Sequence, residues 1–344
     1  MELSDFGYYL PPELIANEPA PKRDASRMLV VDRGARVYTD SAFADLPRRL
    51  KRGDILVLNN TKVFPARLLG TSETGARVEI FPMTRLSDSS WEGLARPGRR
   101  LKEGKRISFG TELAATIVKR TAEGRFEIEF EFAGSLDELL DRIGKTPLPP
   151  YITRDSTEYE STDRERYQTI YAKHRGAIAA PTAGLHFTSG VLEEIAGRGV
   201  ELAEITLHVG YGTFEPVRVD DLSRHSVLPE RYEIDPSSAQ ILQRARRERR
   251  RIVAVGTTTT RALETAVSKH GDLVAGPGVA DLTITPGYRF EAVEALLTNF
   301  HLPKSSLLIL VSTFGGHKLI MDAYKHAVAS RYRFYSYGDC MFIE

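Results

Sequence analysis

The chain has 344 residues, with 47 lysines and arginines against 46 aspartates and glutamates, so its formal net charge is +1. This balance excludes a protein that holds nucleic acid by being basic over its whole surface, although it leaves local basic patches open. A hydrophobic content of 42% and a charged content of 27% exclude general disorder and predict a folded chain of about two domains.

Cysteine content and the length of the hydrophobic runs indicate the cellular compartment. Cys340 is the only cysteine, so no intrachain disulfide or cysteine-based zinc cluster can form. Residues 1–12 lack the basic and apolar regions of a secretory signal. The longest strongly apolar run, 307–311, is far shorter than the ~20 residues that span a bilayer. We therefore expect a cytoplasmic protein that does not enter a membrane, and we expect a monomer.

In the first part of the chain, short apolar segments predict buried strands at 28–31 and 55–58. From about residue 66 the pattern changes to short strands with turn residues between them, at 97–98 and 103–104. The segments 77–80 and 126–132 alternate with the period of two that a half-buried strand needs, and a helix is predicted at 136–143. This spacing predicts a small barrel or sandwich.

The rest of the chain alternates between helices and strands. Helices are predicted at 165–173, 189–197, 236–250, 261–269 and 318–329, and strands at 176–180, 200–209, 252–255 and 307–311. Such alternation predicts an α/β layer with a mostly parallel sheet. The predicted fold is a discontinuous α/β sheet domain, formed by 1–65 and 149–344, with a small antiparallel β-barrel domain inserted at 66–148.

Four polar segments follow predicted strands or lie beside them, at 181–187, 207–213, 256–261 and 297–306. In an α/β sheet, ligands bind at the carboxyl ends of the strands. His186 is able to donate, accept or shuttle a proton, whereas the alternative is a structural histidine in a tight loop. For His208, a role in the site and a role as a buried core residue are equally consistent with the sequence. The threonines at 257–260 suit a carboxylate or phosphate at a helix N-terminus, or else cap that helix.

Other features leave a binding role and a structural role open. Aromatic and charged residues interleave at 332–339, which suits base stacking but also a strand in the core. Six cations and one anion lie in each of the segments 96–106 and 244–251, where RNA contact competes with a solvated face. The eight histidines have no His-Glu-x-x-His pattern or short ligand spacing, so we expect no metal site.

Taken together and in order, these segments resemble the S-adenosylmethionine:tRNA ribosyltransferase-isomerases of the queuosine pathway. The resemblance runs over nearly the whole chain. The matching motifs are LPPELIA (10–16), RDASR (23–27), PARL (65–68), LPPYI (148–152), ERYQT (165–169), APTAGLHFT (180–188), TLHV (206–209), AVGTT (254–258), TNFHLP (298–303) and YRFYSYGD (332–339). One departure is at 225–230, where the family commonly has His-x-Met-His-x-Glu. This chain reads HSVLPE, so Leu228 replaces the second histidine.

The resemblance implies a reaction on tRNA that bears 7-aminomethyl-7-deazaguanine at the wobble position. The ribosyl part of S-adenosylmethionine moves to the aminomethyl nitrogen and rearranges, giving epoxyqueuosine-tRNA with release of adenine and methionine. S-adenosylmethionine is consumed as a substrate, and the proton transfers require no cofactor and no metal. The resemblance also implies the family's fold, an α/β domain with an inserted β-barrel.

These tasks imply candidate residues. The catalytic candidates are His186, His208, His301 and Asp339. The candidates for substrate binding are Arg23, Ser26, Arg27, Thr182, Gly184, Gly210, Tyr211, Gly212, Thr257, Thr258, Arg261, Asn299, Ser306 and Tyr337. Two other functions compete with this hypothesis. A non-catalytic RNA-binding protein would use the basic clusters and the aromatic C-terminal segment, and a metal hydrolase would use the histidines.

Overall fold

The computed structural model describes residues 1–122, 124–152, 154, 159–210 and 216–344. The chain divides into two compact units. The first unit contains Met1–Lys62, Pro150–Thr153 and Gln168–Glu344, and the second contains Val63–Pro149 and Arg154–Tyr167. The boundaries expected from the sequence, at 65/66 and 148/149, remain a prediction about which parts fold as domains.

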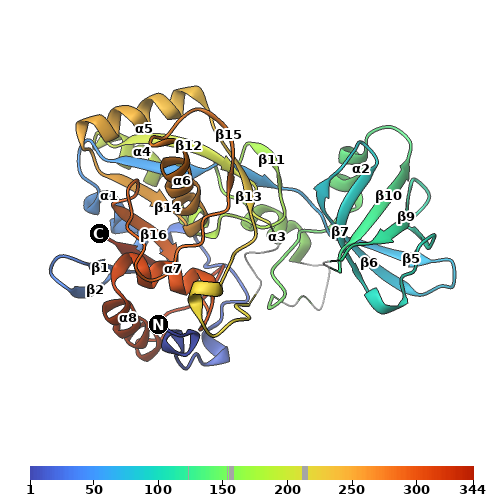
Figure 1. Cartoon of the computed structure of the whole chain (residues 1–344), viewed down its shortest axis with the longest axis horizontal. Helices are drawn as coiled ribbons and strands as arrows, with labels where there is room; N and C mark the ends of the chain where they lie inside the picture. Colours follow the sequence, from blue (N-terminus) through green and yellow to red (C-terminus); the bar gives the residue numbers. More distant parts are fainter. Residues whose placement is uncertain (123, 153, 155–158, 211–215) are drawn as a thin grey trace. The chain divides into compact units, whose positions relative to one another are not determined.

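In the described part of the first unit, nine strands form one sheet in the order β15-β13-β12-β3-β14-β16-β17-β1-β2 (Figure 1). Their bounds are β1 Arg27–Asp32, β2 Val37–Ala42, β3 Ile55–Asn59, β12 Glu201–Leu207, β13 Glu230–Ile234, β14 Ile252–Val255, β15 Gly276–Ala280, β16 Ala295–Asn299 and β17 Cys340–Ile343. A separate two-stranded sheet pairs β4 (Thr61–Val63) with β11 (His174–Ala177).

The nine-stranded sheet is mixed, so the prediction of a mostly parallel sheet was wrong for the outer strands. The central strands β12, β3, β14 and β16 are parallel neighbours. Antiparallel pairing occurs between β16 and β17 and in the outer pairs β1–β2, β12–β13 and β13–β15. The connection 33–36 between β1 and β2 is too short for the crossover that a parallel pair requires, so this pair forms a hairpin.

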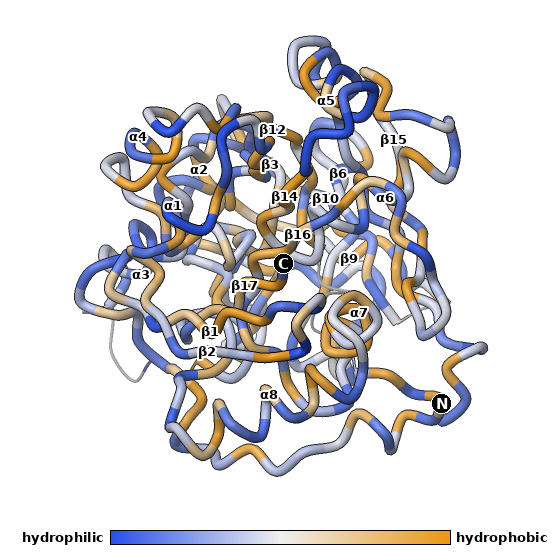
Figure 2. Tube along the Cα trace, turned by 90° about the vertical axis from the view of Figure 1, so that its left-hand side faces the viewer, coloured by the Kyte–Doolittle hydropathy of each residue, from blue (hydrophilic) through white to orange (hydrophobic). Residues whose placement is uncertain are grey.

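Helices cover both faces of this sheet, because alternate residues of each strand point to opposite sides. Ile55 and Val57 of β3 lie in the same apolar cluster as buried residues of α5 (Pro236–Glu248), α6 (Thr257–His270), α7 (Ser306–Gly315) and α8 (His317–Ala329). Leu56 and Leu58 lie in a second cluster with α1 (Leu46–Arg49) and α4 (Ser189–Gly197). The central strands β14 and β16 are accordingly coloured as hydrophobic in Figure 2.

The second unit contains a closed barrel with the strand order β10-β7-β6-β5-β8-β9. The strands are β5 Leu68–Ser72, β6 Arg77–Arg85, β7 Ser90–Arg96, β8 Arg106–Ser108, β9 Leu113–Arg120 and β10 Phe126–Phe132, and the pairs with a described register are antiparallel. The helices α2 (Leu136–Ile143) and α3 (Glu160–Arg166) belong to the same unit. Both β10 and α2 have the bounds expected from the sequence. The α/β sheet with a small antiparallel barrel is confirmed.

Three predicted elements were wrong in type or position. The apolar segment 307–311 lies in helix α7, because a short run of apolar residues fits a buried helix as well as a buried strand. Helix α6 begins at Thr257 rather than Arg261, so the four threonines form its first turn. The helix expected at 165–173 ends at Arg166, and the next residues, which include the β-branched Thr169 and Ile170, form turns.

Among the described residues, none of the helices combines the length and the apolar character that crossing a membrane requires.

Candidate functional site

A pocket lies in the first unit, at the carboxyl ends of the parallel strands β12, β14 and β16. Its space is about 560 Å³, including the part that opens to solvent. The described residues that line it are Ala179, Ala180, Pro181, Thr182, Ala183, Val209, Gly256, Thr257, Thr258, Thr298, Asn299, Phe300, His301, Leu307, Tyr335 and Ser336. None of them is an aspartate, glutamate, lysine or arginine, so the described lining carries no formal charge when its histidine is neutral.

The N-terminus of α6 forms one wall of this pocket. Gly256 precedes the helix with a φ of 94°, a conformation that favours glycine. Thr259 and Thr260 turn their hydroxyls back onto the carbonyl oxygens of residues 255 and 256, at 2.7 Å and 3.1 Å. Thr257 and Thr258 line the pocket instead. The four threonines therefore divide into two that bond to their own helix and two that face the site, next to the positive end of the helix dipole.

His186 connects two elements beside the pocket. Its Nδ1 lies 2.9 Å from Oγ of Ser26, and its Nε2 lies 3.3 Å from Nδ2 of Asn299. An amide nitrogen can only donate, so Nε2 accepts this hydrogen bond and the ring proton is on Nδ1, which donates to Ser26. The ring also packs at 5.3 Å from that of Phe43. The chain Ser26–His186–Asn299 thus fixes both the tautomer and the orientation of the imidazole.

Asn299 ends β16 and offers an unpaired acceptor at the pocket. Its Nδ2 donates to the carbonyl oxygen of Tyr335 at 3.1 Å, which fixes the orientation of the amide. Its Oδ1 is buried and has no hydrogen-bond partner among the described residues. A buried acceptor without a partner costs about 1–3 kcal/mol. A ligand with an N–H or O–H group would remove that cost.

Tyr335 is held in an unusual conformation at the same place. Its φ is 76°, a region that residues other than glycine rarely adopt. Its backbone N–H donates to the carbonyl of Phe300 at 3.1 Å, and its ring packs 4.3 Å from that of Tyr151. The hydroxyl of Tyr151 also accepts a hydrogen bond from the backbone N–H of Ser336. Strained backbone of this kind is common at functional sites.

His301 lines the pocket with a second fixed imidazole. Oγ1 of Thr298 lies 2.8 Å from its Nε2 and 3.3 Å from the carbonyl oxygen of Asn299. Thr298 therefore fixes the orientation of the ring, and the tautomer of His301 decides whether Nε2 donates to Oγ1 or accepts from it. The hydroxyl of Tyr324 accepts from the backbone N–H of His301, and that of Tyr8 donates to its carbonyl.

Burial keeps both imidazoles neutral. It lowers the pKa of His186 to about 4, with a further contribution from the charges of Arg23 and Arg333. It lowers the pKa of His301 to about 3. At neutral pH each ring therefore carries one proton and one lone pair, so each is able to accept a proton but is not a ready imidazolium acid.

These two pKa shifts predict a stability that falls as the pH falls. An unfolded histidine has a pKa of about 6.5, so below that pH the unfolded chain binds protons that the folded chain does not. Between pH 7 and pH 5 we expect each of the two histidines to cost about 2 kcal/mol of unfolding free energy. Urea denaturation at both pH values measures the loss. His301→Asn should reduce the pH dependence, and an unchanged dependence would contradict the assignment.

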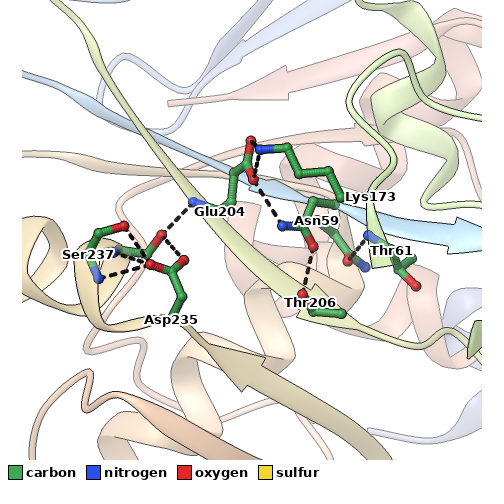
Figure 3. A network of polar contacts seen from close by, with 9 residues as sticks. Asn59, Thr61, Lys173, Glu204, Thr206, Asp235 and Ser237 are labelled. Atoms are coloured by element: carbon green, nitrogen blue, oxygen red, sulfur yellow. Dashed lines mark hydrogen bonds and ion pairs between the residues drawn. The ribbon is translucent and has the colours of Figure 1, made fainter. Parts of the chain in front are cut away.

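His208 lies at the end of β12 and is held by a structural network. Its Nδ1 is 2.8 Å from Oγ1 of Thr61. Burial lowers its pKa, with a smaller effect from His174. Figure 3 shows polar contacts of β12, which include Glu204 with Lys173 and Thr206 with Asn60, the residue after β3. His208 is not among the described residues that line the pocket, although its neighbour Val209 is.

The comparisons with known proteins agree with each other. A family model described as "Queuosine biosynthesis protein" matches residues 3–343. The chain is 50% identical to a protein of Symbiobacterium thermophilum and 46% identical to one of Acetivibrio thermocellus, over 100% of both chains in each case. Both relatives are named S-adenosylmethionine:tRNA ribosyltransferase-isomerase. This chain belongs to the queuosine biosynthesis protein family.

A solved structure of a family member is also similar. The crystal structure of an S-adenosylmethionine tRNA ribosyltransferase from Thermotoga maritima is 35% identical to this chain, with a TM-score of 0.56. The match covers 99% of this chain and 100% of that one. The α/β sheet with a small barrel is therefore the fold of the family.

The pocket of this family member brings together some of the residues predicted from the sequence. Thr182, Thr257, Thr258, Asn299 and His301 line it. Ser26 and His186 reach it through Asn299, and Gly184 follows Ala183 in the same wall. A β-carbon on Gly184 would lie 2.1 Å from the hydroxyl of Tyr171, so only glycine fits there. Tyr211 and Gly212 lie outside the described residues.

Several other predicted site residues hold the backbone. Asp339 accepts from the backbone N–H groups of Arg27 and Arg333, at 2.9 Å and 2.8 Å, while burial raises its pKa. The guanidinium of Arg27 stacks on Tyr332 and donates to the carbonyl of Ser330. Arg23 donates to the carbonyl of Leu185, two residues after Ala183. Tyr337 is buried. Asp339, Arg27 and Arg23 thus bond to backbone groups in this structure, and the catalytic and binding roles predicted for these residues remain predictions.

A second, smaller pocket contains the segment in which this chain departs from the family pattern. Its lining includes His225, Leu228, Glu230, Arg261 and Ser306, and it shares Leu307 with the first pocket. Nε2 of His225 is 2.8 Å from Oγ of Ser306. Arg261 and Glu230 form a buried ion pair at 2.9 Å, and Glu230 also accepts from the backbone N–H of Gly210 at 3.0 Å. Leu228 is 38% exposed, so leucine places an apolar group where the family commonly has histidine.

Tyr335 and Ser336, from the C-terminal segment of the chain, line the pocket but were not among the candidate site residues. The interleaved aromatics at 332–339 were a signal for this segment, but they did not distinguish Tyr335 from Tyr337. Among the described residues, no group of three or more histidine, cysteine, aspartate or glutamate side chains is arranged to hold a metal ion.

Proposed function

We propose that this protein transfers the ribosyl part of S-adenosylmethionine to 7-aminomethyl-7-deazaguanine at the wobble position of tRNA and isomerises it to give epoxyqueuosine-tRNA. The observation that carries the proposal is the family match over residues 3–343, with relatives of the same length that bear the name of this activity. The pocket supports it, because it lies at the carboxyl ends of parallel strands, where α/β sheets bind ligands, and because polar side chains such as Thr257, Thr258 and Asn299 line it.

In this proposal the pocket binds S-adenosylmethionine, and the neutral histidines handle protons. The sulfonium acidifies the hydrogens on the adjacent 5′ carbon, so a base is able to remove one. His186 is one candidate because its ring is neutral. Its lone pair on Nε2 accepts from Nδ2 of Asn299, so this hydrogen bond must open before the ring takes up a proton. His301 is the second candidate, because its neutral ring lines the pocket. Adenine and methionine then leave, and the aminomethyl nitrogen carries the rearranged ribosyl group.

The uncharged lining has a consequence for binding. A sulfonium cation in this pocket would meet carbonyl and hydroxyl oxygens rather than a carboxylate, so binding relies on hydrogen bonds and shape. We propose that Oδ1 of Asn299 accepts from an N–H or O–H group of S-adenosylmethionine, and that Thr257 and Thr258 bind at the N-terminus of α6. S-adenosylmethionine is consumed, so no resident cofactor or metal enters the proposal.

The experiment is an assay with purified protein, S-adenosylmethionine and tRNA that bears 7-aminomethyl-7-deazaguanine. We expect release of adenine and methionine in equal amounts, together with a gain of mass in the tRNA. The control is the same tRNA with an unmodified guanine at the wobble position, which lacks the attacking amine. Binding of tRNA without any adenine release would instead favour a non-catalytic RNA-binding protein.

We also propose that the protein acts in the cytoplasm as a monomer. The proposal rests on the substrates, which are tRNA and S-adenosylmethionine, and on the position of the whole pocket lining within one unit of a single chain.

A further inference from the structure

Outside residues 96–105, most of the described cations on the β-barrel unit have an acidic partner. Arg67 pairs with Glu79, Arg106 with Glu131, Lys119 with Glu127, Arg125 with Glu92 and Arg142 with Glu112, at distances between 2.6 Å and 3.0 Å. A carboxylate about 3 Å away cancels most of the field of a cation beyond its own neighbourhood. These pairs therefore contribute little attraction for a distant anion.

The segment that joins β7 to β8 is different. We call residues 96–105 the β7–β8 loop, which runs from Arg96, the last residue of β7, to the residue before β8. Arg96, Arg99 and Lys102 are exposed and Lys105 is half-buried, and the described structure contains no ion pair for any of the four. The only anion in the loop, Glu103, interacts with Lys119 outside it. The β7–β8 loop thus concentrates unpaired positive charge in a unit whose other cations are mostly neutralised.

The β7–β8 loop is also firmly attached to the barrel. Leu101 is buried, with 7% of its surface exposed. The backbone N–H of Gly104 donates to the carbonyl of Ile117 at 2.8 Å, and the N–H of Ile117 donates to the carbonyl of Lys105 at 3.0 Å. A turn closes between Lys102 and Lys105. The cations therefore project from an ordered support, which lowers the entropy that binding an anion would cost.

The second basic segment of the chain is used in another way. Arg244 and Arg250 both pair with Glu201, Arg246 pairs with Asp272, and Arg251 pairs with Asp54 at 2.6 Å. Only Arg247 and Arg249 in that segment have no ion pair in the described structure. In sequence the two segments are alike, with six cations and one anion each. In the structure, the segment at 244–251 fastens α5 to neighbouring elements.

We propose that the β7–β8 loop binds the phosphate backbone of tRNA. This arrangement fits the phosphates of a nucleic-acid backbone. Several exposed cations on a fixed support neutralise adjacent phosphates, and the counterions of those phosphates are released. The proposal rests on the proposed function, which supplies tRNA as the substrate. It places a docking surface on the barrel unit, on residues that are not part of the pocket lining.

The test uses the full chain with three loop cations neutralised, R99Q/K102Q/K105Q. The matched control is R77Q/R247Q/R249Q, which removes the same three charges from exposed arginines outside the loop that also lack an ion pair. The dissociation constant for tRNA is measured at several salt concentrations. For the loop variant we expect binding weaker by about tenfold at low salt and a slope of log K against log salt reduced by about 2 to 3. The control should keep most of the wild-type slope.

Further measurements distinguish failure of the loop proposal from failure of the proposed function. The charge-preserving variant R99K/K102R/K105R should bind tRNA as the wild type does, which would show that the loss in the loop variant is due to charge rather than to misfolding. Adenine release at saturating tRNA should be unchanged in the loop variant. If the wild type releases adenine but the loop variant binds tRNA as the control does, the loop proposal is overturned and the proposed function stands. If the wild type neither binds tRNA nor releases adenine, both are overturned.

Discussion

Replacement of His186 by alanine is expected to lower the rate of adenine release at least tenfold at saturating substrates, since a positioned acid–base group contributes about 10²–10⁴-fold. The ring joins Ser26 to Asn299, so its loss removes the proton acceptor and leaves the amide of Asn299 with one partner fewer. The measurement is a steady-state assay of adenine release. Turnover equal to that of the wild type would remove His186 from the catalytic residues.

A second variant separates proton transfer from positioning. His186→Gln keeps an oxygen that is able to accept from Nδ2 of Asn299, but an amide does not take up a proton near neutral pH. If His186 transfers the proton, His186→Gln should be as slow as His186→Ala while the KM for S-adenosylmethionine stays near the wild-type value. Recovery of turnover in His186→Gln would assign the histidine to positioning, and the search for the base would move to His301.

Replacement of Arg261 by alanine is expected to lower the free energy of unfolding by about 3–5 kcal/mol, the usual cost of removing one partner of a buried ion pair. Its guanidinium lies 2.9 Å from Oε2 of Glu230 and also donates to the carbonyls of Leu228, Ala280 and Leu282. The side chains of Arg261 and Glu230 are only 7% and 5% exposed. Without the arginine, Glu230 keeps a buried negative charge that has lost its cation. Urea denaturation at pH 7 measures the change.

The same variant tests the substrate-binding role that the sequence suggested for Arg261. Arg261→Lys keeps the charge but loses the planar fork that reaches three carbonyls and a carboxylate, so we expect an intermediate loss of stability. An Arg261→Ala protein that unfolds like the wild type and yet has a much higher KM for S-adenosylmethionine would contradict the structural role. It would show that the arginine turns towards the substrate.

Local features of the sequence predicted individual elements well. Asp235 followed by Pro236 marked the start of α5, where the aspartate accepts from the backbone N–H groups of residues 237 and 238. Thr188 capped α4 in the same way. The alternation at 126–132 gave β10 its bounds. In each case the deciding interaction joins residues a few positions apart, so the sequence contains it directly.

Site residues that follow a predicted strand were found from the sequence. Residues whose role depends on contacts with distant parts of the chain were not. Thr257 follows the predicted strand β14, so its place at the carboxyl edge of the sheet was expected. Asn299 ends β16, which was not predicted, because the apolar segment at 307–311 was predicted as the strand and the structure has helix α7 there. Asp339 looked equally polar and equally well placed. Its partners, the N–H groups of Arg27 and Arg333, became evident only when β17 was seen beside β1.

The sequence by itself determined the family, through motifs that extend from residue 10 to residue 339, and those helices and strands whose pattern is local. The tertiary structure alone decided which of the two basic segments, 96–106 or 244–251, has most of its described cations outside ion pairs. Arg251 pairs with Asp54, 197 residues away in the chain, and the loop cations at 96–105 have no such partner in the described structure. Composition counts charges, but the field at a surface depends on which charges lie within a few ångströms of each other, and only the fold sets those distances.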